Sequence, residues 1–170
     1  MLLTIILFVV GLIASYFIAK WQMKKNKIVH FTIKSYDIGK GLRDEFPEFE
    51  LHFSGETLSK DVKVIKGGFI NIGKNDIEGA EFNLVLPDGC IIKTIKIAPT
   101  DDNLIVNASV APDKKHIIRF TINGIFISDE HFEYTAIVEV PEEIDDIADK
   151  MLFQHRIKNT EKIKKIYIGE

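Results

Sequence analysis

The side chains most able to do chemistry in this sequence are five histidines and one cysteine, because imidazole and thiolate groups act as general bases, nucleophiles and metal ligands. Their spacing does not assemble them into a known metal or catalytic motif. The cysteine, Cys90, heads an apolar stretch and is expected to be a small core residue. The histidines fall within or beside alternating stretches, which predicts surface or partly buried structural roles. They are His30, His52, His116, His131 and His155.

Acidic and glycine-rich segments give no stronger sign of a site. Asp101-Asp102-Asn103 and the stretch from Glu142 to Asp149 lack the alternating oxygen ligands and central glycine of a calcium loop. Gly39-Lys40-Gly41 resembles a fragment of a phosphate-binding loop, but no Lys-Ser/Thr ending follows it. The sequence therefore predicts no catalytic residue, cofactor or metal, and favours a non-enzymatic protein. A hydrolase would need polar side chains to converge from distant strands.

The first nineteen residues predict a single transmembrane helix. Eighteen residues, from Leu2 to Ala19, carry no charge, and a helix of that length spans about 27 Å, close to the hydrocarbon thickness of a bilayer. A cleaved signal peptide is disfavoured because no basic residue precedes the apolar run and no small residue stands three positions before the best cleavage points. We expect a membrane anchor at 1–19, a basic linker at 20–27 and a folded domain at 28–170.

Lysines flank only one end of this helix, which predicts its orientation. None precedes it, and Lys20, Lys24, Lys25 and Lys27 follow it within eight residues. The positive-inside rule then places the folded domain in the cytoplasm, as a single-pass protein of the cell membrane. The opposite topology stays open, and it would make the domain an envelope-facing structural or adhesion module.

Three small residues are spaced by four along the predicted helix. Gly11, Ser15 and Ala19 therefore share one face, and small residues at that spacing let transmembrane helices approach closely. The lipid bilayer is the expected partner of this segment, and self-association through the small-residue face is a hypothesis.

Charge and cysteine content narrow the class of the remaining chain. All 25 acidic residues and 18 of the 22 basic residues follow Lys27, so residues 28–170 carry a formal charge of −7. Such a balance argues against nucleic acid, whose phosphates require clustered lysine and arginine. A single cysteine permits no intramolecular disulfide and is compatible with a reducing compartment.

Short runs of period-two alternation, separated by turn residues, predict a mainly β domain. No segment between them is long enough for the crossover of a parallel α/β fold. We expect an immunoglobulin-like antiparallel β-sandwich, with a bulge or close backbone approach at Gly67-Gly68. The expected strands cover 28–36, 48–53, 62–72, 80–86, 90–98, 104–110, 116–122 and 131–140.

The last thirty residues are expected to add a short helix and a final hairpin. Pro141-Glu142-Glu143 is typical of a helix start, and apolar residues recur at helical spacing as far as Met151. Alternation then returns on both sides of a turn at 158–161, which favours two paired strands. A single long helix ending near Asn159 is the alternative.

Several strand-and-turn segments resemble small bacterial membrane-anchored proteins with an immunoglobulin-like sandwich. They are Phe69-Ile70-Asn71-Ile72-Gly73 with Asp76-Ile77, Phe49-Glu50-Leu51 and Glu130-His131-Phe132. The resemblance covers about residues 48 to 140. It implies a fold and a membrane tether, and it carries no catalytic residues because these proteins are largely uncharacterised.

These observations together predict a membrane-tethered binding or sensing module at the inner face of a bacterial membrane, with a protein partner or small ligand. Loops on a rigid scaffold are the usual contact surfaces of such modules. The segment from Asp37 to Pro47 is therefore the expected contact region.

Overall fold

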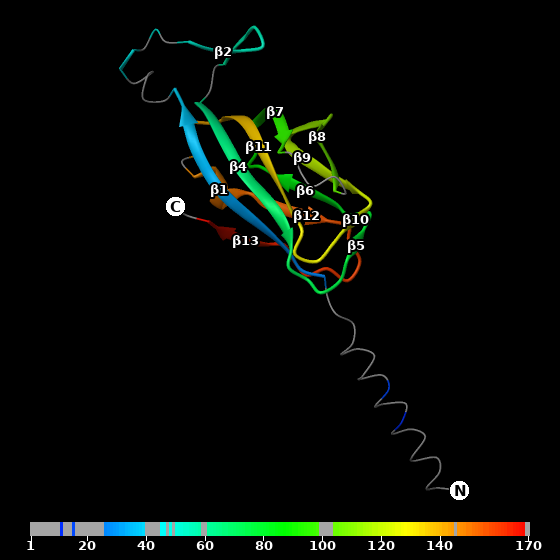
Figure 1. Cartoon of the computed structure of the whole chain (residues 1–170). Coiled ribbons are helices and arrows are strands. Elements are labelled where there is room, and N and C mark those ends of the chain that lie inside the picture. Colours follow the sequence, from blue (N-terminus) through cyan, green and yellow to red (C-terminus); the bar gives the residue numbers. More distant parts are fainter. Residues whose placement is uncertain are drawn as a thin grey trace, which may run out of the picture.

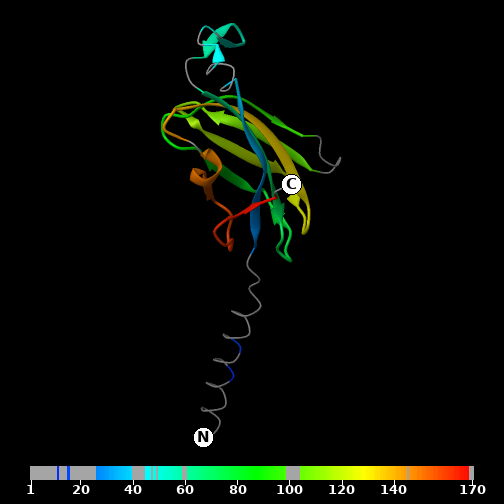
Figure 2. The same cartoon turned by 90° about the vertical axis from the view of Figure 1, so that its left-hand side faces the viewer.

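The computed structural model describes residues 11, 15, 26–39, 45–46, 48, 50–58, 61–98, 104–144 and 146–168. Two β-sheets form the body of the domain (Figures 1 and 2). The first has the order β13 (Lys164–Tyr167), β1 (Ile28–Ile38), β4 (Asp61–Asn71), β11 (His131–Val140) and β7 (Ile91–Ile97). The second has the order β12 (Leu152–His155), β6 (Glu81–Val85), β9 (Lys114–Asn123) and β8 (Ile105–Ala111).

Three smaller elements complete the described chain. The hairpin of β2 (Leu51–Phe53) and β3 (Glu56–Leu58) lies at the opposite end of the domain from the start of β1 (Figure 1). The strands β5 (Ile77–Glu78) and β10 (Ile125–Phe126) pair with each other. One four-residue helix, α3 (Ile147–Lys150), precedes β12.

The core lies between the two sheets and is dominated by aromatic rings. Phe69 and Phe132 from the first sheet face Phe82 and Phe120 from the second, with ring centroids 4.5 Å apart for Phe69 and Phe82. Strand β11 buries every second side chain against them, as expected for strands whose side chains alternate between faces. The predicted mainly β sandwich is confirmed. A strand lies within each of the eight expected ranges, but the one expected at 48–53 is reduced to β2 and lies outside the two sheets.

The order of the strands differs from the immunoglobulin arrangement. Of the first four long strands, β1, β4 and β7 lie in one sheet and β6 lies in the other, which is how strands A, B, D and C are divided in that fold. An immunoglobulin chain then continues within the same sheet, whereas here β8 and β9 form a hairpin in the opposite sheet before the chain returns at β11. The sandwich prediction was therefore right and its immunoglobulin-like connectivity was wrong.

The C-terminal hairpin was also a wrong prediction. The short helix is present, but β12 pairs with β6 in one sheet and β13 pairs in parallel with β1 in the other. The predicted turn exists, with Asn159 at a positive φ of 53°. The chain from 156 to 163 then crosses between the layers, and stacked sheets are about 10 Å apart. The parallel pair means that the sandwich is not purely antiparallel.

The close approach predicted at Gly67-Gly68 is confirmed. A Cβ atom on Gly67 would lie 2.7 Å from the carbonyl oxygen of Phe31, and one on Gly68 would collide with the Phe132 carbonyl and the Phe31 ring. The irregularity in register lies across the sheet in β1, between Thr32 and Lys34. The absence of a side chain at Gly68 thus leaves room for the Phe31 ring, and its absence at Gly67 leaves room for the Phe31 carbonyl and the His30 ring.

The predicted membrane helix lies outside the described residues apart from Gly11 and Ser15, which are both helical and exposed. Within the described residues, no helix is long and apolar enough to cross a membrane.

Candidate functional site

Strand β1 is paired on both edges along only half of its length. From Val29 to Thr32 it lies between β4 on one side and β13 on the other. After Ile168 donates its N–H to the Thr32 carbonyl at 3.1 Å, no strand among the described residues pairs with that side of β1. The segment from Ile33 to Ile38 continues to pair with β4 and leaves its other edge open. We call this segment the open half of β1.

The hydrogen-bonding pattern shows which backbone groups point to the open edge. Asn71 of β4 donates its N–H toward the β11 side, so alternate residues from Asn71 along β4 bond that way and the others bond β1. Val64 therefore bonds Tyr36, which lies opposite it. Ser35 and Asp37, on either side of Tyr36, direct their backbone N–H and C=O groups to the open edge.

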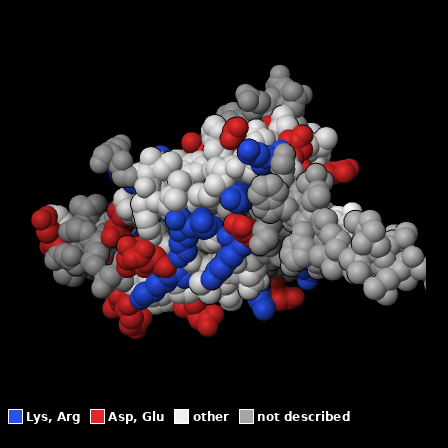
Figure 3. Space-filling model, turned by 90° about the horizontal axis from the view of Figure 1, so that it is seen from below, with Lys and Arg blue, Asp and Glu red and all other residues white. Residues whose placement is uncertain are grey.

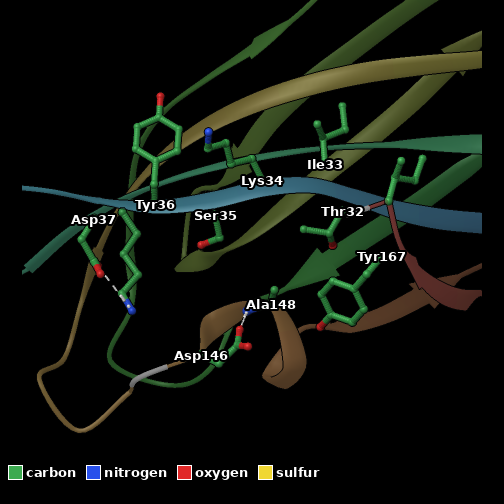
Figure 4. Close-up of a pocket in the computed structure, with 11 residues that line it drawn as sticks. Thr32, Ile33, Lys34, Ser35, Tyr36, Asp37, Asp146, Ala148 and Tyr167 are labelled. Carbon is green, nitrogen blue, oxygen red and sulfur yellow. Dashed lines mark hydrogen bonds and ion pairs between the residues drawn. The ribbon is translucent and has the colours of Figure 1, made fainter. Parts of the chain in front are cut away.

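A groove of about 430 Å³ runs beside this edge. One wall is β1 from Thr32 to Asp37, and the other contains Asp146 and Ala148 at the start of α3 together with Tyr167 and Ile168 at the end of β13. Figure 4 shows Thr32, Ser35 and Asp37 on the side of β1 that faces Asp146 and Tyr167, whereas Ile33, Lys34 and Tyr36 point the other way.

An ion pair closes one end of the groove. The Nζ atom of Lys63 lies 3.4 Å from the Asp37 carboxylate (Figure 4) and donates to the Ile144 carbonyl at 3.3 Å. The Lys63 side chain is 9% exposed and that of Asp37 is 37% exposed. A lysine buried to this degree requires such partners, because a buried unpaired charge is costly. The pair fixes the position of Asp37 at the end of the open edge.

The opposite wall is held by hydrogen bonds between α3 and β13. Asp146 caps the helix by accepting the N–H of Ala148 at 2.9 Å, as is common for aspartate at this position. Lys165 donates to the Asp149 carbonyl at 2.7 Å, and the Tyr167 hydroxyl donates to the Asp149 carboxylate. Burial and this hydrogen bond raise the pKa of Tyr167 to about 12, so its hydroxyl stays protonated at neutral pH.

The groove contains groups that can form hydrogen bonds and ion pairs with a ligand. Hydroxyls, carboxylates, one ammonium group and an open backbone edge can donate and accept hydrogen bonds. No histidine or cysteine lines it. Among the described residues, no three histidine, cysteine, aspartate or glutamate side chains are placed to hold a metal ion.

His30 is the one histidine whose placement differs sharply from expectation. It is fully buried, packs 4.5 Å from the Phe153 ring, and shares a 2.9 Å hydrogen bond with the Tyr134 hydroxyl. Burial, with a smaller contribution from the charge of Lys165, lowers the pKa of His30 to about 3. The side of β1 that looks polar in the sequence therefore faces the core at His30, and the histidine is neutral there.

Among the described residues singled out in the sequence, Lys27, Gly11 and Ser15 do not line this groove. Lys27 is exposed immediately before β1. Gly11 and Ser15 are exposed. The helix face that they are expected to share with Ala19 stays a prediction. The positions Lys20, Lys24, Lys25 and Ala19 lie outside the described residues. Of the expected contact loop at 37–47, the structure describes Asp37 to Gly39, Glu45 and Phe46, and Asp37 is the residue that reaches the groove.

Sequence reasoning missed the groove, although one signal of it was present. Lys34, Ser35 and Asp37 place polar groups on both faces of a strand that is apolar on one face before them. A strand that becomes polar on both faces has left the core. The contributions of Asp146 and Tyr167 had no local signal, because they come from segments more than 100 residues later.

Comparison with protein-family models and with curated protein sequences gives no match. Several solved structures are similar at low level, and two of them come from Clostridium thermocellum. One is a biomass sensing module from Rsgi-like proteins of Clostridium thermocellum, described as resembling a family 3 carbohydrate-binding module of the cellulosome. It has a TM-score of 0.40 and 8% identity, over 84% of this chain and 99% of that one.

The other is a CBM3a-L domain with flanking linkers from the scaffoldin cipA of the same organism's cellulosome. It has a TM-score of 0.29 and 8% identity, over 85% of this chain and 79% of that one. With both TM-scores below 0.5, neither likeness says what this chain binds. The resemblance to small membrane-anchored proteins stays a prediction.

Proposed function

We propose that this chain is a membrane-tethered, non-enzymatic binding module that takes up an extended segment of a partner protein at the open half of β1. The observation that carries the proposal is the change along one strand edge. β13 occupies that edge as far as Thr32, and from Ile33 to Asp37 the edge borders a groove instead. A partner strand would continue the ladder that β13 begins.

The chemistry of the edge favours a peptide over a compact ligand. An open strand edge is a template for another strand, and addition of a strand uses main-chain hydrogen bonds for affinity and side-chain pockets for specificity. Ser35 and Asp37 supply the main-chain groups. The carboxylates of Asp37, which also pairs with Lys63, and of Asp146 can accept hydrogen bonds from the side chains of the bound segment.

The tether in this proposal rests on the apolar run from Leu2 to Ala19, and the side of the membrane rests on the lysines that follow it. The domain then lies at the inner face of the membrane, where it would hold or sense a partner close to the bilayer. The small-residue face of Gly11, Ser15 and Ala19 offers a route for association of two tethered copies.

A peptide selection tests the binding function. Random peptides displayed on phage are selected against the full chain in lipid nanodiscs, and the selected peptides are measured against two variants. Ser35→Pro removes the outward N–H, so we expect affinity to fall at least about tenfold. Ser35→Ala keeps that N–H and should bind within about twofold of wild type. Equal loss in both variants, or selected peptides indifferent to Ser35→Pro, would refute binding at this edge.

The topology needs its own test. A reporter enzyme active only outside the cytoplasm, fused after Glu170, should be inactive, and a cytoplasmic reporter at the same position should be active. The reverse result would refute the inner-face assignment and favour the envelope-facing alternative. Moving the four linker lysines to the N-terminal side of the helix should invert the wild-type result.

A further inference from the structure

A second, smaller cavity of about 80 Å³ lies where the chain enters the domain. It is lined by the apolar side chains Val29 and the half-exposed Ile72, and by Lys27, Lys162 and Lys164 with one acid, Glu161. Lys158 is exposed on the neighbouring turn. We call Lys27, Lys158, Lys162 and Lys164 the basal collar. A lining that combines apolar side chains with ammonium groups fits a group that combines a phosphate with a hydrocarbon part.

The collar is fixed to the point where the N-terminal segment leaves the domain. The N–H of Asn26 donates to the Asn159 carbonyl at 2.8 Å, and the N–H of Glu161 donates back to the Asn26 carbonyl at 3.1 Å. The Asn26 side chain also donates to the Lys158 carbonyl at 3.1 Å. These hydrogen bonds therefore hold the collar next to Asn26, where the N-terminal segment joins the domain.

The charge of this end contrasts with the rest of the domain. Residues 28–170 carry a formal charge of −7, yet a band of basic side chains crosses the face seen from below in Figure 3, with acidic groups gathered toward its edges. Within the part of the chain that the structure describes, no ion pair joins a collar lysine to a carboxylate. The collar lysines are therefore available to an external anion.

The linker allows the collar to lie close to a bilayer. Six residues lie between Ala19 and Asn26, and the seven steps that join these two positions span about 25 Å of fully extended chain and about 10 Å if the helix continues. The Debye length at physiological ionic strength is about 8 Å, so a continued helix leaves the lysines close to the range of anionic headgroups. Juxtamembrane lysines are attracted to such headgroups.

We infer that the basal collar binds anionic phospholipid headgroups of the membrane that anchors the chain. The inference rests on the tether in the proposed function and adds the lipid class and the residues. Lys27, Lys162 and Lys164 would hold the phosphate at the cavity, and Val29 with Ile72 would contact the glycerol and upper acyl carbons. Binding there would orient the domain on the membrane, with the hairpin β2–β3 at the far end.

Native mass spectrometry of the detergent-solubilised full chain tests the lipid preference. The chain is offered an equimolar mixture of phosphatidylglycerol and phosphatidylcholine, and bound lipids are counted. We expect a preference for phosphatidylglycerol of about tenfold. The triple variant Lys158→Gln, Lys162→Gln, Lys164→Gln should lower it at least about threefold. A matched triple variant at exposed lysines outside the collar, Lys66→Gln, Lys114→Gln, Lys115→Gln, should keep the wild-type preference.

The outcomes separate the collar from the tether. An unchanged preference in the collar variant would overturn the inference and assign lipid binding to the linker lysines. A poly-glutamate peptide that displaces phosphatidylglycerol at equal charge would overturn it in favour of an acidic protein partner. Flotation of the full chain with vesicles of pure phosphatidylcholine reports the anchor separately. Failure to float would refute the tether, and the collar variant would still decide the lipid site.

Discussion

The two halves of β1 pair with the same strand, β4, and differ in burial and in the pairing of their other edge. From Ile28 to Thr32 all five residues are buried, both edges are hydrogen-bonded along most of the length, and both faces are covered. From Ile33 to Asp37 every residue is exposed and one edge is open. The covered half packs and pairs within the domain, and the open half can pair with a strand of another molecule. The boundary lies at Thr32, where β13 ends and the register shifts.

A larger side chain at Gly68, which lies against the covered half, should cause the largest loss of stability. Gly68→Val would drive side-chain atoms into the Phe132 carbonyl and the Phe31 ring, so we expect a loss of about 4 kcal/mol in the free energy of unfolding. Lys66→Val, two residues away on the same strand and exposed, should change it by less than about 0.5 kcal/mol. Chemical denaturation measures both. A Gly68→Val protein as stable as wild type would show that this contact is not close.

Two neighbouring proline substitutions should separate the two edges of the open half. Tyr36→Pro removes an N–H that bonds β4 and should cost about 2 kcal/mol or more, since a buried ladder acceptor loses its donor. Ser35→Pro removes an N–H that faces the open edge and should cost less than about 1 kcal/mol. The midpoint of urea unfolding gives the ranking. Equal losses would contradict the alternation assigned here to the open half.

Acid should weaken the covered half through His30. Its pKa is 6.5 in the unfolded chain and about 3 when folded, so between these values the unfolded chain binds a proton that the folded chain does not. Stability should therefore fall as the pH falls from 6.5 towards 3, by up to about 1.4 kcal/mol per pH unit from this group. Stability curves of wild type and His30→Phe, measured at several pH values, isolate this slope. Parallel curves would contradict a buried neutral histidine.

The wall of the groove should be the least sensitive to change. Tyr167→Phe removes the hydroxyl that donates to Asp149 on a side chain that is half exposed, so the expected loss is below about 1 kcal/mol. The raised pKa of about 12 also predicts that wild type loses stability as the pH rises from 10 to 12. Tyr167→Phe should lack that contribution. Alkaline unfolding curves that coincide for the two proteins would exclude it.

The same contrast explains how far the sequence could predict the fold. Strands such as β11 were predictable because their alternation is set by one core face, with Phe132, Tyr134 and Ala136 all inward. The orientation of β1 was not predictable. Phe31 is buried on the outer face because Gly68, 37 residues away, has no side chain and leaves room for the Phe31 ring. The sequence around β1 does not indicate which distant residue Phe31 will contact.

The groove was hidden for a related reason. Its far wall depends on β12 and β13 joining different sheets, and their alternation alone fitted a hairpin equally well. The deciding contacts are those of Asn26 with Lys158, Asn159 and Glu161, which direct the chain toward β1. Asn26 lies in a segment that reads as a linker, so nothing local indicated that it would hold the C-terminal loop.

Residue-resolved amide hydrogen exchange in the full chain tests the open half most directly. In the free protein the amides of Ser35 and Asp37 should exchange rapidly, while that of Tyr36, bonded to β4, should be protected. A peptide selected for binding should slow Ser35 and Asp37 by at least about tenfold and leave Tyr36 unchanged. Ser35 and Asp37 amides that stay fast with the peptide bound, or that are already protected without it, would contradict the account.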